Sequence, residues 1–470
     1  VYADSDADYA TVEKTLNAAG GLIEGALNAA CGDKDSLRLV NFTGQTRGAD
    51  LARFTAQQAE HGHALRIGEH IAPLQQILRA DGTQEWIAPV PALPAMGWVR
   101  ADLTAEGATD RKGPEVAPGR LENNHVRVRF DIKGEIISIY DKTRDRELLK
   151  AGQTANQLIA YEDKPLAYDA WDVDHYYDKK SWPLSEQPAK IEVAETGPHR
   201  AALRIERGYR GSRIVQVISL GTTSAQLEFD TYVDWRERQT FLKALFPLDL
   251  NVAEARAEVQ FGHVTRPTHS NTSWDAARFE ACMHRWVDMS EPDFGAAILN
   301  DCKYGYSADG TTLGISLLKG PNYPDPDADL GAHQFRYALV LHSGERDIEQ
   351  VVQAAERFNN PIRLLGDPSV DVTTATEAEA FSFAQINTSE ICIETVKAAQ
   401  NGDGFILRLY ETANRRSRAR LSFGVEVDAL QEVDMIEQFI DSRIEISGNT
   451  AELEFRPFEV KTLHLRLSNG

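Results

Sequence analysis

The sequence is poor in cysteine and contains no long hydrophobic run. Its 470 residues include four cysteines, and no two of them have the Cys-x-x-Cys spacing. Neither a thiolate zinc site nor a disulfide framework is therefore indicated, and a reducing compartment fits best. No stretch approaches the roughly 18 apolar residues that a transmembrane helix needs. We expect a cytoplasmic protein without a membrane partner.

Positive charge is also scarce. Lys and Arg number 50 against 71 Asp and Glu, which gives a formal net charge of −21. This surplus opposes binding to nucleic-acid phosphates and anionic lipids, whereas a neutral ligand such as a sugar is compatible with it. The sequence also has no nucleotide-binding glycine loop. Hydrophobic residues make up 42%, so a chain of this length can build roughly two to four domains.

The pattern that is present predicts mostly strands. Val126–Ile132 alternates apolar and charged residues, and Leu227–Trp235 repeats the same period of two. Many such strands with short connections are typical of a large antiparallel β-sandwich. Asp347–Phe358 has an apolar stripe of helical period instead. The proline-rich stretch Ala88–Pro94 cannot be a helix interior, and we expect an edge or crossing strand there.

Composition divides this mainly β chain into five segments. They are a helix at 1–32, a small β domain at 33–106, a linker rich in Gly and Pro at 107–118, the large sandwich at 119–360 and a C-terminal β domain at 361–470. The first segment has no initiator methionine and runs almost directly into its helix. We therefore expect the chain to be part of a longer protein.

One polar stretch between predicted strands, Phe261–Asp275, is rich in groups that meet ligands. It contributes six candidate binding residues: His263, Arg266, His269, Asn271, Trp274 and Asp275. Loops on a rigid sheet often carry function. The alternative is a solvated hairpin with a packed tryptophan. The stretch has no His-x-His spacing and no carboxylate cage, so we expect no metal site built by this chain alone.

Two further clusters combine rings with polar groups. Tyr168–Tyr177 holds Trp171, Asp172 and Asp174. Rings beside carboxylates suit sugars, whose C–H faces pack on rings and whose hydroxyls donate to acids. A packed loop whose aspartates cap turns is an equally good interpretation. The second cluster is a polar turn that contains three candidate binding residues, Asn300, Asp301 and Tyr304.

A glycosidase of the usual kind needs a pair of carboxylic groups, and the sequence does not identify such a pair. Several stretches nevertheless follow one family in order: Asn156–Pro165, Trp171–Asp174, Val233–Glu237, Gln260–His269, Asn271–Asp275, Leu299–Asp301, Pro324–His333 and Pro457–Lys461. On these motifs the chain resembles the C-terminal portion of a glycoside hydrolase family 38 α-mannosidase of the cytosolic-type branch.

The resemblance implies a retaining enzyme that removes terminal α-D-mannose. In that family an N-terminal barrel carries a divalent metal, zinc or cobalt, together with the catalytic carboxylates. A helical bundle follows the barrel, so the resemblance implies that the helix at 1–32 is left from that bundle. The chain would then have no catalytic or metal-binding residue of its own and would be inactive alone. It would pack on the barrel and lend loops to the rim of a pocket for mannosides. The alternative is an autonomous carbohydrate-binding module, and the amphipathic helix at 4–31 also suggests a homo-oligomer.

Overall fold

The structure is a computed structural model that describes residues 37–105, 107, 112–366 and 380–468, together with Thr11 and Lys14. The helix expected at 1–32 lies outside the described residues, apart from those two. The mainly β fold class is confirmed, because strands dominate the described chain and its helices are few and short. No described helix combines the length and the apolar composition that crossing a membrane requires.

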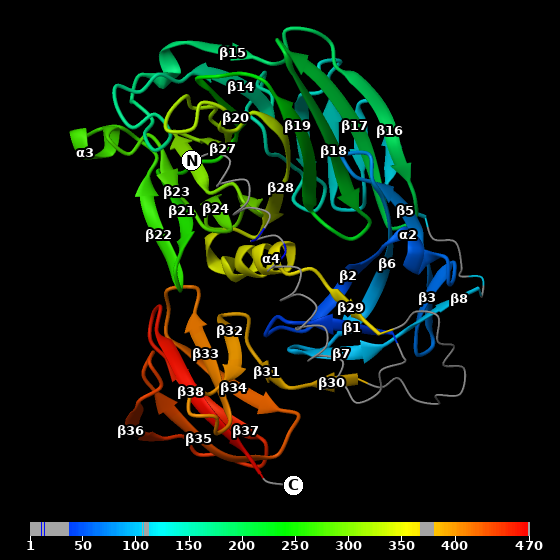
Figure 1. Cartoon of the computed structure of the whole chain (residues 1–470), viewed down its shortest axis with the longest axis vertical. Coiled ribbons are helices and arrows are strands. Elements are labelled where there is room, and N and C mark those ends of the chain that lie inside the picture. Colours follow the sequence, from blue (N-terminus) through cyan, green and yellow to red (C-terminus); the bar gives the residue numbers. More distant parts are fainter. Residues whose placement is uncertain are drawn as a thin grey trace.

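The larger sheet of the sandwich has nine antiparallel strands in the order β16-β17-β18-β19-β28-β25-β24-β21-β22. Their bounds in that order are Lys190–Thr196, Arg200–Tyr209, Ser212–Gly221, Gln226–Trp235, Gly331–His342, Gly295–Asn300, Trp286–Ser290, Glu254–Val259 and Gly262–Pro267. The alternation read in β19 is real, since Phe229, Val233 and Trp235 are fully buried. This sheet forms the broad upper part of the molecule (Figure 1).

A second sheet packs against the first. Its order is β15-β14-β20-β27-β26-β23, with bounds Ser181–Pro183, Gln157–Glu162, Thr240–Pro247, Thr312–Leu318, Gly305–Asp309 and Ala281–Cys282. The rings of Phe246 in β20 and Phe229 in β19 lie 5.8 Å apart, so the two sheets share one core. A five-stranded sheet adds to that core, with β13 (Arg146–Glu147), β12 (Ile136–Asp141), β11 (Val126–Phe130), β10 (Arg120–Glu122) and β9 (Glu115–Ala117).

Three small sheets form the region that is mostly blue in Figure 1, where the late strands β29 and β30 are yellow to orange. Their orders are β29-β1-β7-β30, β2-β6-β5 and β4-β3-β8. The bounds in that order are Arg363–Leu365, Arg38–Asn41, Gly97–Arg100 and Ala380–Ser382; Arg47–Phe54, Gln84–Leu93 and Gln75–Leu78; His70–Pro73, Ala64–Ile67 and Asp102–Thr104. A short helix, α2 (Ala56–Ala59), follows β2. β29 and β30 thus pair with strands roughly 280 to 330 positions earlier, so the whole large sandwich lies between the partners in the sequence.

The proline-rich strand is paired on both sides only at its start. β5 pairs with Gln84–Ile87 of β6, whereas β2 pairs with β6 from Trp86 to Leu93. At Pro89 and Pro91, β6 is therefore paired with β2 and with no other described strand. A missing N–H is tolerated at such an edge, as expected for this stretch.

The C-terminal region is a second, smaller sandwich, drawn in orange and red (Figure 1). Its sheets are β31-β34-β37 and β32-β33-β38-β35-β36. The bounds in that order are Ala384–Ile386, Ser417–Phe423 and Thr450–Phe455; Ile391–Ala398, Phe405–Glu411, Val460–Leu467, Val427–Val433 and Phe439–Arg443. Its core is separate from that of the large sandwich.

The predicted helix is α4 (Glu349–Asn359), preceded by the short helix η2 (Glu345–Asp347). Val351, Val352, Ala355 and Phe358 are buried on one side of α4. They pack against β24, β25 and β28 of the nine-stranded sheet. In Figure 1, α4 lies between the large sandwich and the two smaller regions.

Candidate functional site

The three polar stretches singled out in the sequence have contacts that converge on strands β23 and β26. These strands pair with Ala281 opposite Tyr306. The Tyr177 hydroxyl donates a 2.8 Å hydrogen bond to Oε1 of Glu280, the residue before β23. Arg266 in β22 donates a 3.1 Å hydrogen bond to the hydroxyl of Tyr306. Loop, hairpin and turn are thus tied to one strand pair, although they lie far apart in the sequence.

A buried polar network lies beneath this strand pair, and we call it the β23 cluster: Tyr177, Lys243, Glu280, Ser307 and Ser316. The ammonium of Lys243 is fully buried, forms an ion pair with Glu280 and donates a 2.7 Å hydrogen bond to Ser307 Oγ. Ser316 Oγ donates to Glu280 Oε2 at 3.1 Å. Burial lowers the pKa of Lys243 and raises the pKa of Tyr177. The charges of Lys243 and Glu280 offset each other, so the pair can be buried. The hydrogen bond from Tyr177 to Glu280 then fixes the loop to this pair.

Exposed rings stand on the loops that the β23 cluster holds. Trp274 is 75% exposed, Trp171 69% and Tyr304 55%. Trp274 belongs to a short helix, α3 (Ser273–Ala276), which projects from the body of the sandwich (Figure 1). A packed Trp274, the alternative left open by the sequence, is therefore wrong. Large rings left in solvent are typical of surfaces that meet a ligand or partner.

The aspartates of the Tyr168–Tyr177 loop have different roles. Asp174 accepts hydrogen bonds from the Tyr176 hydroxyl and the Leu166 amide, each at 2.7 Å, and these bonds lower its pKa. Asp172 accepts only from the adjacent Val173 amide, at 3.0 Å, among the contacts of the described chain. Asp174 thus shapes the loop, while Asp172 keeps free acceptor capacity.

The tip of the hairpin is organised by short-range polar contacts. Thr272 caps α3, donating to Asp275 Oδ2 at 2.8 Å and accepting from the Asp275 amide at 3.1 Å. His269 Nδ1 lies 3.7 Å from Asp275 Oδ2 and accepts a long 3.5 Å hydrogen bond from the Asn271 amide. These residues hold α3, and with it the exposed Trp274, away from the sheet.

His263 is not brought to the β23 cluster. Its ring packs edge-on against Phe458 of the C-terminal region, with centroids 4.9 Å apart, and lies 5.8 Å from Trp286. Burial lowers the pKa of His263 to about 4, so the imidazole is neutral at neutral pH. Its position is that of a packing residue between two regions of the fold.

Asn300 and Asp301 hold the third turn from inside. Asn300 is fully buried; it donates to the His284 carbonyl at 2.7 Å and accepts from the Lys303 amide at 2.9 Å. Asp301 forms a 3.1 Å ion pair with Arg336. Of the three turn residues proposed from the sequence, Tyr304 alone presents most of its side chain to solvent.

The sequence reasoning missed Lys243 and Glu280. A signal was present, because Lys243 interrupts the apolar strand Thr240–Pro247 at a position that has to be buried. A lysine at such a position requires a carboxylate partner. Nothing in the sequence identifies Glu280 as that partner, since it lies on a different strand connection.

One arrangement resembles a hydrolytic triad only in its residue types. His342 Nε2 lies 2.8 Å from Asp288 Oδ1 and 3.4 Å from Ser290 Oγ, while its Nδ1 accepts from the Gly344 amide at 3.2 Å. The same ring nitrogen therefore faces both the acid and the hydroxyl. A catalytic histidine has to use opposite nitrogens for these two partners, so this group is structural.

The described residues also do not fit the divalent metal that the resemblance implies. Across 37–105, 112–366 and 380–468, no three His, Cys, Asp or Glu side chains are grouped so that they could hold a metal ion.

Two sequence profiles match the chain. One is described as "Glycosyl hydrolases family 38 C-terminal domain" and matches residues 121–327. The other is described as "Glycosyl hydrolases family 38 C-terminal beta sandwich domain" and matches residues 390–463. The chain belongs to glycosyl hydrolase family 38.

Relatives of this family 38 chain include Alpha-mannosidase 2C1 of Homo sapiens, 38% identical over 352 residues, covering 74% of this chain and 33% of that protein. Alpha-mannosidase G of Dictyostelium discoideum is 33% identical over 352 residues, covering 73% and 32%. The chain thus spans about a third of the length of these relatives.

A solved structure shares the fold. An alpha-mannosidase from Enterococcus faecalis V583 superposes with a TM-score of 0.67 at 17% identity, covering 92% of this chain and 56% of that one. At this identity the likeness concerns the arrangement of the sheets.

Proposed function

We propose that this chain is the C-terminal β part of an α-mannosidase that hydrolyses terminal α-D-mannose residues with retention. Its substrates are mannosides and mannose-containing oligosaccharides. The observation that carries the proposal is the match of about three quarters of the chain to four proteins named as α-mannosidases, at 31% to 38% identity.

In this proposal the loops around the β23 cluster form part of the rim of the substrate pocket. Trp171, Trp274 and Tyr304 are exposed, so their rings are available to the C–H faces of a sugar. Asp172 offers carboxylate oxygens to hydroxyl groups, and Arg266 is positioned by Tyr306. This mixture of rings and a few polar groups is what a neutral sugar requires.

The catalytic carboxylates and the divalent metal are proposed to come from an N-terminal barrel of the complete protein. The residues that the structure describes contain no group of side chains that fits the ion. The chain would support the barrel and be inactive alone. A cytoplasmic location and a homo-oligomer stay predictions.

The test is an assay of 4-nitrophenyl α-D-mannoside with this chain and with the complete protein at equal concentration. We expect turnover by the complete protein alone, with α-mannose as the first product seen by NMR. Robust turnover by this chain would overturn its supporting role. Initial release of β-mannose would overturn retention.

An autonomous carbohydrate-binding module is the second candidate, favoured by the exposed Trp171 and Trp274. It predicts that the chain binds mannose oligosaccharides through these rings, while the complete protein hydrolyses no mannoside. Calorimetry with the W171A/W274A variant separates this candidate from the first when it is combined with the activity assay.

A further inference from the structure

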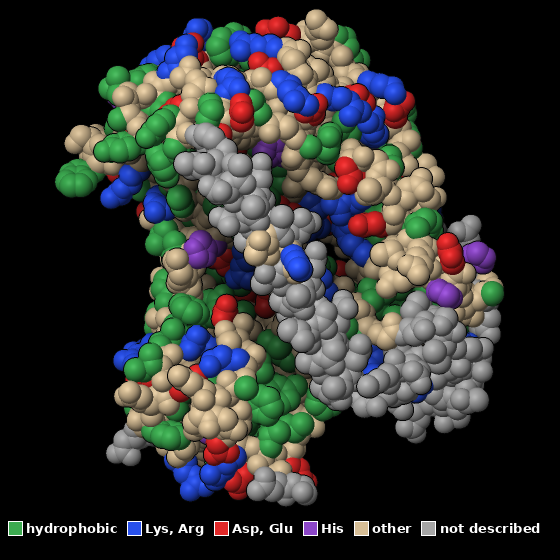
Figure 2. All heavy atoms as spheres, in the orientation of Figure 1, with side chains coloured by type: hydrophobic (Ala, Val, Ile, Leu, Met, Phe, Trp, Pro, Cys, Tyr) green, Lys and Arg blue, Asp and Glu red, His purple; other side chains and the backbone are tan. Residues whose placement is uncertain are grey.

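A cavity of about 600 Å³ lies away from the β23 cluster, where the small sheets, the large sandwich and helix α4 meet. Strands β2 and β6 form one side, and strands β17 to β19 with helix α4 form the other. In Figure 2 the molecule is hollowed between the upper sandwich and the regions below it, with Lys and Arg side chains visible in the hollow. None of the twelve binding residues proposed from the sequence lines this cavity.

One wall of the cavity is largely apolar. It is formed by residues of β2 and β6 that include Leu51, Ile87, Pro89 and Pro91. The prolines stand where β6 is paired only with β2 among the described strands. An apolar wall of this kind suits the C–H face of a ring-shaped ligand.

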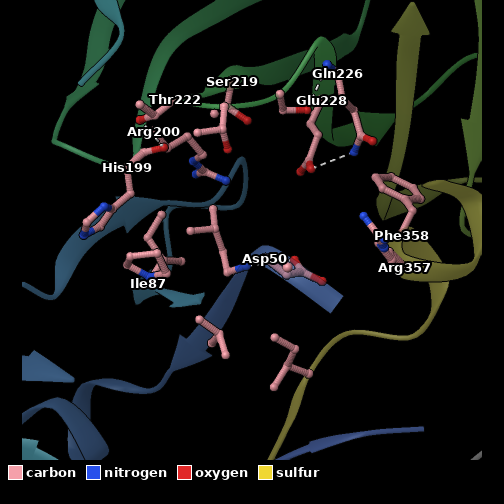
Figure 3. A pocket seen from close by; sticks show the side chains of 18 of the residues that line it. Asp50, Ile87, His199, Arg200, Ser219, Thr222, Gln226, Glu228, Arg357 and Phe358 are labelled. Atoms are coloured by element: carbon pink, nitrogen blue, oxygen red, sulfur yellow. Dashed lines mark hydrogen bonds between the residues drawn. The ribbon is translucent and has the colours of Figure 1, made fainter. Parts of the chain in front are cut away.

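The opposite wall is polar. In Figure 3 the side chains of Arg200, Ser219, Glu228, Arg357 and Asp50 border the same space. The Glu228 carboxylate accepts a 2.9 Å hydrogen bond from Gln226 through Oε1, its Oε2 lies 3.9 Å from the guanidinium of Arg53, and 30% of its side chain is exposed. The cavity therefore offers carboxylate acceptors beside guanidinium donors.

The charges of this wall are largely balanced. Arg200 forms two hydrogen bonds of 2.8 and 2.6 Å with Glu195, and Arg53 pairs with Glu85 at 3.2 Å. Arg336 pairs with an aspartate outside the cavity at 3.1 Å. The guanidinium group of Arg357 has no hydrogen-bond or ion-pair partner among the described residues. The carboxylate of Glu228 lines the same cavity and so brings a negative charge to it. A free anion would meet carboxylates here and a cation would meet guanidinium groups, so neither is favoured.

We propose that this cavity is a second carbohydrate site that takes a neutral mono- or disaccharide. A sugar hydroxyl can accept from Arg357 and donate to Glu228, while the C–H face of the ring packs on the wall formed by β2 and β6. The volume lies within the range of about 300–1,000 Å³ that is common for small-ligand sites. The cavity holds no exposed tryptophan, so it differs in kind from the loops with exposed rings. Only the choice of mannose as the probe rests on the proposed function.

The test is a calorimetric and NMR titration of the 470-residue chain with mannose and with an α-linked mannobiose. Two variants remove polar groups of the cavity, R357M and E228A. Two matched controls, R418M and E454A, remove an ion pair whose side chains are 83% and 73% exposed on the C-terminal sandwich. Thermal unfolding confirms that each variant is folded. We expect each cavity variant to weaken sugar binding at least about tenfold, which is about 1.4 kcal/mol, while the controls bind as the wild type does.

Three results would overturn the proposal. The first is the absence of sugar binding by the folded wild-type chain. The second is binding that survives R357M and E228A but is lost in W171A/W274A, which would place the sugar at the exposed rings. The third is binding of inorganic phosphate in place of sugar, which would identify an anion site. Hydrolysis by the complete protein is measured separately, so failure of this proposal leaves the proposed function intact.

Discussion

Two regions of the molecule bury charged side chains for different ends. In the β23 cluster, a buried Lys243–Glu280 pair stands behind loops whose rings reach solvent. At α4, a comparable group that we call the α4 seam is covered on several sides: Arg47, Glu258, Arg285, Glu356 and Cys392. Arg285 binds both oxygens of Glu258, and Cys392 donates to Glu356 at 3.7 Å. Buried charge by itself therefore does not identify a binding site.

The difference lies in what surrounds each network. The α4 seam joins residues of the small sheets, the large sandwich and the C-terminal sandwich, and Glu356 and Cys392 are each less than 10% exposed. Its charges serve the contact between three parts of the fold. The β23 cluster instead anchors the ends of loops, so its charges set the positions of side chains that face outward.

The largest expected effect is that of breaking the pair in the β23 cluster. K243M leaves Glu280 largely buried without a cation, and removing one partner of such a pair costs about 3–5 kcal/mol. We expect urea unfolding at pH 7 to show a loss of this size. K179M is the matched control, because Lys179 is 75% exposed beside Asp178 and such pairs contribute little. Equal stabilities of the two variants would show that the buried pair is not needed.

The next largest expected effect on stability is that of protonating His263, at the contact between the two sandwiches. Its pKa is lowered by burial from 6.5 to about 4, so the folded state binds fewer protons than the unfolded state between these values. The stability it contributes is present above pH 6.5 and is lost as the pH falls toward 4, by up to about 3 kcal/mol.

H263F removes this titration. Urea unfolding at pH 5 and at pH 7.5 should show a wild type that loses more stability than H263F on acidification. If the pH dependence of stability is unchanged in the variant, the pKa of His263 is not lowered in the folded protein.

Glu356, in the α4 seam, should give a pH dependence of stability opposite in sign to that of His263. Burial raises the pKa of this carboxyl above 4.5. Its contribution to stability is therefore fully present below pH 4.5 and is lost as the pH rises through the higher value reached in the folded state. We expect E356Q to be more stable than the wild type at pH 7, with the difference vanishing toward pH 4.5. A destabilised E356Q at pH 7 would mean that the nearby arginines require the charge.

The exposed rings should have the smallest effect on stability. W171A and W274A remove side chains that are mostly in solvent, so each should change the unfolding free energy by less than about 0.5 kcal/mol. In the complete protein we expect a several-fold rise in KM for a mannoside, because these rings are proposed to meet the sugar. Unchanged kinetics for both variants would return the loops to a structural role.

The regular elements were predictable because their patterns are local. The period of two in Leu227–Trp235 predicted a strand, which is β19, and the apolar stripe of Asp347–Phe358 predicted a helix, which is α4. Pairings between distant strands were not predictable. Nothing in Arg363–Leu365 specifies that it pairs with Arg38–Asn41, since such pairing depends on how the intervening sandwich brings the two together.

The sequence identified the loops of the candidate site by their residue types, but it predicted neither the exposure of their rings nor the contacts that support them. Residue types alone singled out Trp171, Trp274 and Tyr304. The roles of Asn300 and His263 depend on tertiary contacts with a carbonyl and with a ring of another region. A polar residue looks the same in sequence whether it faces a ligand or completes a buried network.

The return of β29 and β30 to the small sheet has a consequence for synthesis. β1 and β7 are the inner strands of that sheet, and their outer neighbours begin at Arg363 and Ala380. While the ribosome is making the large sandwich, both inner strands have been translated but keep an unpaired edge that invites pairing with other chains. A chaperone that shields these edges until the last two strands emerge would therefore raise the yield of folded protein, and a chain cut before β29 would aggregate.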